Sequence, residues 1–106
     1  MDAPPTLPAY SGETLANLSV TGLIDLLIGD EDRVPRNVID ECARRGEEMM
    51  ECLSGLPEND RYWQDEATQG QWWLLLHAVM ILGLIPDERA GRLLVEFMRR
   101  MAEAQD

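Results

Sequence analysis

The sequence contains no lysine, so arginine supplies all nine of its basic residues, against twenty aspartates and glutamates. This shortage of positive charge leaves a formal net charge of −11 at neutral pH. A surface with this charge repels phosphate groups and anionic lipids, which disfavours binding to nucleic acids or to membrane surfaces. We therefore expect neither as a partner, and instead expect a protein partner with a basic surface.

Cysteine and histidine are also scarce: the sequence contains only Cys42, Cys52 and His77. On a helical pattern the two cysteines lie roughly 15 Å apart, beyond the reach of a disulfide bond. Their spacing from the histidine resembles no zinc site. The first residues lack the basic start and apolar core of a signal peptide. We expect reduced cysteines, a cytoplasmic protein, and no metal or cofactor.

The chain has one long apolar stretch, residues 72–85, whose sequence is WWLLLHAVMILGLI and whose only polar side chain is His77. At helical rise it is roughly 20 Å long, whereas a bilayer core measures about 30 Å. The stretch is therefore expected to be the central helix of a packed domain, covered on nearly every side. Gly83, near its end, is expected to permit close approach of another backbone.

Helical periodicity marks the rest of the chain, and no strand-like alternation is present. Residues 1–18 are expected to be extended or disordered, and residues 19–106 to form one all-α domain. Four main helices are predicted, over about residues 20–28, 35–54, 68–85 and 86–103. In the second, Gly46 could mark a kink, a break into two short helices or a point of close approach, and the unbroken phase of the apolar stripe favours a continuous helix. A long connection covers about residues 54–69.

The segment HAVMILGLIPDERAGRLLVEFM resembles the second half of a HEAT repeat of the short bacterial type. The positions that carry the resemblance are Ala78, Leu82, Gly83, Asp87, Ala90 and Leu94. Pro86 and the insert over residues 54–69 depart from that pattern. The resemblance implies two antiparallel helical hairpins stacked as HEAT-like repeats. Because such arrays usually need about three repeats or special caps, we expect a homodimer or a longer parent array.

The favoured function is a non-enzymatic protein–protein interaction or scaffold module. Tyr62 and Trp63 are candidate contacts because tyrosine and tryptophan are enriched at binding hot spots; the alternative is a pair folded back as a lid. Glu47, Glu48 and Glu51 are the other candidates, on an acidic helix face. That face lacks the Glu-x-x-His motif of di-metal bundles, which favours a solvated surface over a metal site.

Two further functions stay open at this point. One is a small enzyme that uses His77 with nearby carboxylates, although a buried neutral imidazole with a backbone or carboxylate partner is the plainer interpretation. The other is an acidic inhibitor that mimics nucleic acid and blocks a basic partner. A pocket that holds His77 among convergent polar groups would favour the enzyme.

Overall fold

Helix α5 (Gln69–Leu84) is the element around which the other helices are arranged, and it packs against α2, α3 and α6. The computed structural model describes residues 7–64 and 67–104, and those residues contain helices and no strand. Along the chain, the remaining elements are α1 (Gly12–Ala16), α2 (Val20–Asp30), η1 (Glu31–Arg33), α3 (Arg36–Arg44), α4 (Glu47–Leu53), η2 (Asp60–Trp63) and α6 (Glu88–Ala104).

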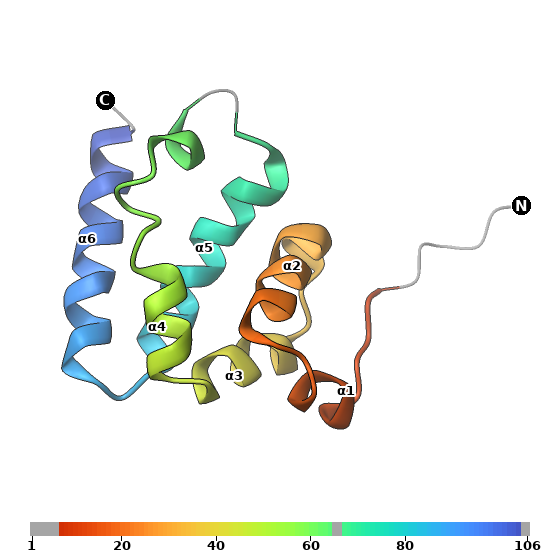
Figure 1. Cartoon of the computed structure of the whole chain (residues 1–106). Coiled ribbons are helices and arrows are strands. Elements are labelled where there is room, and N and C mark those ends of the chain that lie inside the picture. The colour runs from red at the N-terminus through yellow and green to blue at the C-terminus, as the bar shows by residue number, and fades with distance from the viewer. Residues whose placement is uncertain (1–6, 65–66, 105–106) are drawn as a thin grey trace, which may run out of the picture.

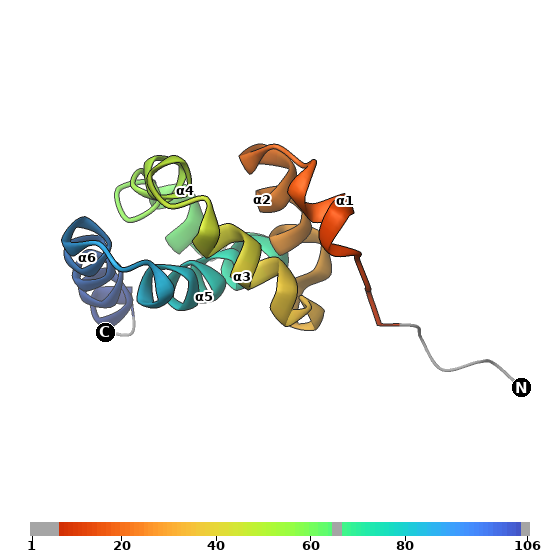
Figure 2. The same cartoon turned by 90° about the horizontal axis from the view of Figure 1, so that it is seen from below.

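The helices form two layers. Helices α5 and α6 run antiparallel in one layer, and α2 and α4 lie on the same side of α5 in the other (Figures 1 and 2). The shortest principal extent of the molecule is 18 Å, which suits two helix layers at the usual interaxial distance of about 8–10 Å. The buried core lies between the layers.

The local sequence explains where α5 begins and what it packs against. The Thr68 hydroxyl accepts a hydrogen bond from the Gln71 amide, and the Gln71 side chain accepts one from the Thr68 amide, which forms a capping box. In the first turn, a Cβ built on Gly70 would lie 2.5 Å from the carbonyl oxygen of Ile28. Gly83 is instead exposed, and a Cβ there meets nothing within 4 Å. Within the chain, the prediction of close approach at Gly83 is therefore wrong, and the close contact lies at Gly70.

The predicted continuous helix over residues 35–54 is also wrong. Gly46 has φ +56° and separates α3 from α4, although the apolar stripe keeps its phase on both sides of it. Positive φ is a conformation that glycine adopts without steric penalty. Periodicity alone gave no sign of this break, because both short helices bury residues on the same side.

The segment expected to be extended contains a short helix in its described part, α1. The Ser11 hydroxyl caps α1, and Leu15 is buried in the core. The Arg45 guanidinium donates hydrogen bonds to the carbonyl oxygens of Leu15 and Leu18, at 3.1 and 2.8 Å. These long-range contacts hold α1 in place. Residues 1–6 lie outside the described residues.

The all-α class is confirmed, with six α-helices in the described residues rather than four. Helices α5 and α6 form one antiparallel hairpin (Figure 1). The N-terminal half is divided among α1 to α4 and does not reproduce a single second hairpin. In the described part of the chain, no helix has the length and apolar character needed to cross a membrane.

Candidate functional site

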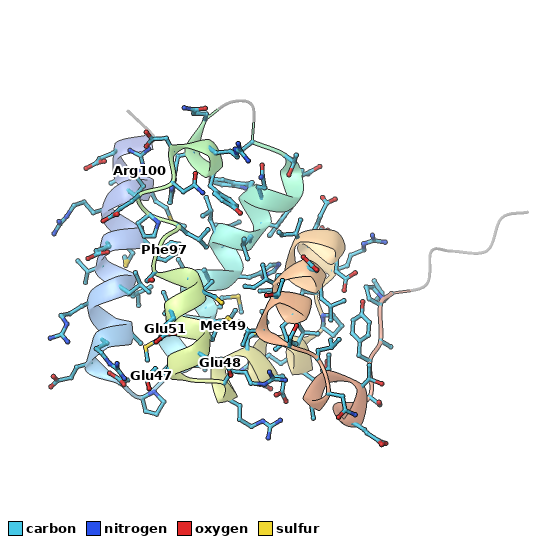
Figure 3. The ribbon with its side chains drawn as sticks, viewed as in Figure 1. Glu47, Glu48, Met49, Glu51, Phe97 and Arg100 are labelled. Carbon is cyan, nitrogen blue, oxygen red and sulfur yellow. The ribbon has the colours of Figure 1, made fainter. Side chains whose placement is uncertain are left out.

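A groove of about 360 Å³ opens between α4 and α6. Its lining residues are Glu47, Met50, Glu51, Ser54, Arg89, Arg92, Leu93 and Glu96. Helix α4 is only seven residues long, and the break at Gly46 sets its direction independently of α3. The labelled side chains Glu47 and Glu51 show where α4 borders the groove (Figure 3).

The groove combines an apolar floor with a charged rim. Met50 from α4 and Leu93 from α6 form the floor, and each is almost completely buried. The remaining lining residues are charged or polar. A ligand group that enters the groove would therefore meet carbon and sulfur atoms at the base and charges at the edges.

Arg89 holds one end of the groove together. Its guanidinium pairs with Glu47 at 3.0 Å and with Asp87 at 2.9 Å, so it links α4 to the turn before α6. Hydrogen bonds from Arg89 lower the pKa of the Asp87 carboxyl below its ordinary value. Both carboxylates at this end of the groove therefore have an ion-pair partner.

The rest of the groove lining carries charges that have no ion-pair partner of this kind. Within residues 7–64 and 67–104, no ion pair involves Glu51, Glu96 or Arg92. All three side chains are exposed and line the groove. Glu51 and Glu96 carry two negative charges against the single positive charge of Arg92, so this part of the lining is net acidic.

The acidic residues predicted as contacts are divided by the structure. Glu47 and Glu51 line the groove, whereas Glu48 is exposed on α4 outside its lining. Glu47 is the member already engaged by Arg89.

The two predicted aromatic contacts lie elsewhere. The indole Nε1 of Trp63 donates to the Leu56 carbonyl at 2.9 Å, and its ring centroid is 6.5 Å from that of Phe97 in α6. The Arg100 guanidinium lies 5.5 Å from the Trp63 ring centroid, a cation–π arrangement. Trp63 is therefore folded onto α6. Tyr62 is half-buried and lines a separate hollow of about 200 Å³.

His77 lines none of these hollows. It is buried, stacks against Trp73 with ring centroids 5.8 Å apart, and its Nε2 lies 2.6 Å from the carbonyl oxygen of Glu31. Cys42 is buried too, and burial raises the pKa of its thiol to about 12, which keeps it protonated and unreactive at neutral pH. Among the described residues, no cluster of His, Cys, Asp or Glu could hold a metal ion.

Sequence reasoning missed most of the α6 side of the groove, namely Arg89, Arg92, Leu93 and Glu96. The available signal was the series of opposite charges four residues apart that marks the polar face of this helix. That pattern identifies a polar face but not the helix that faces it.

No protein-family model matches the chain, and comparisons with curated proteins and with solved structures found no match. The groove is therefore interpreted from its own chemistry.

Proposed function

We propose that this chain is a non-enzymatic protein–protein interaction module that binds an amphipathic, basic segment of a partner protein in the α4–α6 groove. The observation that carries the proposal is the apolar floor of the groove beside two carboxylates without ion-pair partners in the described residues. This supports a ligand with one apolar side chain and a neighbouring cationic group.

The floor favours an apolar anchor. Binding sites of about 300–1,000 Å³ are typically lined by apolar groups with a few well-placed polar ones, and the volume of about 360 Å³ lies in this range. A leucine or methionine side chain between Met50 and Leu93 would replace water against those residues. The thioether of Met50 is flexible enough to adapt to either.

The rim favours a positive charge next to that anchor. Glu51 and Glu96 together would accept hydrogen bonds from an arginine or lysine of the partner. The net charge of −11 adds a long-range attraction for basic segments, which raises the association rate at low salt. Arg92 would disfavour a ligand that is basic along its whole length and so favours an amphipathic one.

The α5–α6 antiparallel hairpin supports a HEAT-like scaffold as the background of this proposal. The two free cysteines are consistent with a cytoplasmic location. Among the described residues, His77 is hydrogen-bonded to a backbone carbonyl and not to a carboxylate, which gives the enzyme alternative no support from its contacts.

The test uses synthetic peptides with leucine and arginine at helical spacing, titrated into the full chain by calorimetry. We expect binding that weakens as salt rises. The double variant Glu51→Gln, Glu96→Gln should weaken binding by roughly two- to thirtyfold, since exposed charge pairs contribute about 0.2–1 kcal/mol each. The single variant Glu51→Gln has a matched control in Glu48→Gln, because each removes one negative charge from α4 and only Glu51 lines the groove.

If Glu48→Gln lowered the peptide affinity as much as Glu51→Gln, the net charge of the chain would attract the peptide without a specific site. A peptide that binds the double variant as tightly as the unmodified chain would place its contacts elsewhere. Either result would contradict the proposal. Chemical-shift changes at Met50 and Leu93 on peptide binding would locate the contact independently.

A further inference from the structure

The outward side of α5 exposes large apolar side chains. Trp72 is 44% exposed, Met80 50% and Leu84 43%. None of the sixteen residues of α5 is an aspartate, glutamate, arginine or lysine. Charged residues normally lie on exposed surfaces. A partly exposed helix without any charged residue is therefore unusual in a chain with net charge −11.

Helix α6 has an apolar side of its own in addition to the one it buries. Its core side consists of Ala90, Leu93 and Phe97, and its charged side reaches α4 through Arg89 and Glu96. At about 100° of rotation per residue, a third side lies opposite the charged one. Its members are Gly91, Leu94, Val95, Met98 and Met101. Val95 is 54% exposed and Met98 58% exposed.

These two surfaces lie on the same side of the molecule. Helix α4 belongs to the other layer (Figure 2), so the side of α6 that is turned away from α4 points in the same direction as the outward side of α5. We call the combined surface the outer hairpin face. It consists of Trp72, Leu76, Met80, Gly83 and Leu84 of α5 and Gly91, Leu94, Val95, Met98 and Met101 of α6.

We infer that the outer hairpin face is the interface of a homodimer, in which the α5–α6 hairpin of one copy packs on the same hairpin of a second copy. A two-fold dimer uses the same patch on both subunits. Contiguous exposed apolar patches on this scale mark interaction sites in soluble proteins.

Charge selects a second copy as the occupant. Two chains that each carry −11 repel one another over most approach directions. None of the ten residues of the outer hairpin face is charged, and the residues that border it beside Val95 are one of each sign, Glu88 and Arg99, so two copies can meet on it with few opposing carboxylates. The basic partner proposed for the α4–α6 groove would gain no ion pair here.

Composition and shape agree with that choice. Homodimer interfaces are more apolar than those of transient complexes, and interface cores are enriched in tryptophan and methionine and depleted in charged residues. Gly83 and Gly91 both have open space where a side chain would be, which permits close approach of a partner helix. Two helices about 24 Å long and about 8–10 Å apart present a projected face of roughly 400–500 Å², so side-chain relief must supply the remainder of the ~800 Å² per partner in standard interfaces.

The experiment is sedimentation equilibrium of the full chain across the micromolar range. We expect a monomer–dimer equilibrium whose dissociation constant rises roughly hundredfold in Met80→Glu and in Met98→Glu, since each places an unpaired charge in the interface. Both positions are exposed, and circular dichroism checks that each variant is folded. Leu7→Glu is the matched control, because it adds the same charge at an apolar side chain that is 68% exposed and outside the face.

Salt separates this inference from the groove proposal. Screening should strengthen the dimer, because it reduces repulsion between like-charged copies, whereas it should weaken a basic peptide in the groove. The groove can therefore fail its test while the dimer passes, and the reverse.

Three results would overturn the inference: a monomer throughout the range, a dimer unaffected by both glutamate variants, or an equal loss in Leu7→Glu. The methyl resonances of Met80 and Met98 provide a second measurement on the unmodified chain. They should shift on dilution while that of the buried Met49 stays constant. Constant Met80 and Met98 resonances would also overturn it.

Discussion

His77 and Glu31 lie 46 residues apart in the sequence and are joined by a 2.6 Å contact between the imidazole Nε2 and the Glu31 carbonyl oxygen. Because a carbonyl can only accept, Nε2 carries the hydrogen atom and donates it. Glu31 has φ +52°, the only positive φ of a non-glycine residue in the described part of the chain. The hydrogen bond thus connects the central helix to the strained residue that begins η1.

Replacing the strained residue should stabilise the protein. Glu31→Gly removes the steric cost of positive φ, about 1–3 kcal/mol, and the backbone carbonyl that His77 binds is retained. Glycine's greater freedom in the unfolded chain offsets about 0.5–1 kcal/mol. We expect a net gain of about 1 kcal/mol in urea unfolding. Glu31→Ala is the control, since it removes the carboxylate but keeps the Cβ, and it should bring no gain.

The existence and order of the main helices could be predicted from the sequence because each buries residues at helical spacing. The starts of α2 and α5 are signalled locally by the capping residues Ser19 and Thr68, and both helices begin within one residue of the predicted positions. The strain at Glu31 and the break at Gly46 could not be found in this way. Both backbone conformations occur between helices whose relative directions are set by their packing on α5, which a local pattern does not report.

Gly46 should tolerate no side chain, although space is available for one. A Cβ there meets nothing within 4 Å, but φ is +56°. Gly46→Ala should therefore lower the free energy of unfolding by about 1–3 kcal/mol through backbone strain alone. Gly29→Ala is the matched control: the site is also open, lies within α2 and has no positive φ. It should instead stabilise by about 0.5–1 kcal/mol, and a loss equal to that of Gly46→Ala would contradict the backbone explanation.

Gly70 should be sensitive for the opposite reason, which is a lack of space. A Cβ would lie 2.5 Å from the Ile28 carbonyl oxygen and 2.8 Å from its Cγ2, so Gly70→Ala must push α5 away from α2. Overpacking of this kind costs about 1–3 kcal/mol, measured as a lower urea midpoint. Gly83→Ala in the same helix has open space and should be neutral or stabilising. Equal effects of the two substitutions would contradict the explanation that Gly70 is required by close contact between α2 and α5.

The candidate groove was half predictable for a related reason. Glu47 and Glu51 were identified as an acidic helix side from their spacing. Arg89, which pairs with Glu47, lies 42 residues further along the chain. Local periodicity shows which side of a helix is apolar or charged. It does not show that α6 lies beside α4, because that placement depends on tertiary packing.

Glu41 and Arg45 form a partly buried pair that should make stability depend on acid. Glu41 is 8% exposed, and hydrogen bonds from Arg44 and then from Arg45 lower the pKa of its carboxyl. Arg45 also binds the carbonyl oxygens of Leu15 and Leu18. The pair therefore holds α3 to the end of α1.

A lowered folded-state pKa means that the unfolded chain takes up the proton first as pH falls. The stabilisation by Glu41 is therefore complete above the unfolded pKa of about 4.5 and is lost as pH falls through the folded pKa. Glu41→Gln should cost about 1.5–3 kcal/mol near neutral pH, the usual contribution of hydrogen bonds to a charged group. Urea unfolding of the two proteins from pH 7 to pH 3 should show this difference shrink in acid.

Asp40→Asn is the matched control, because Asp40 pairs with Arg36 on an exposed surface and should contribute little at any pH. A Glu41→Gln difference that stays constant down to pH 3 would mean that the ionised carboxylate does not hold α1 and α3 together.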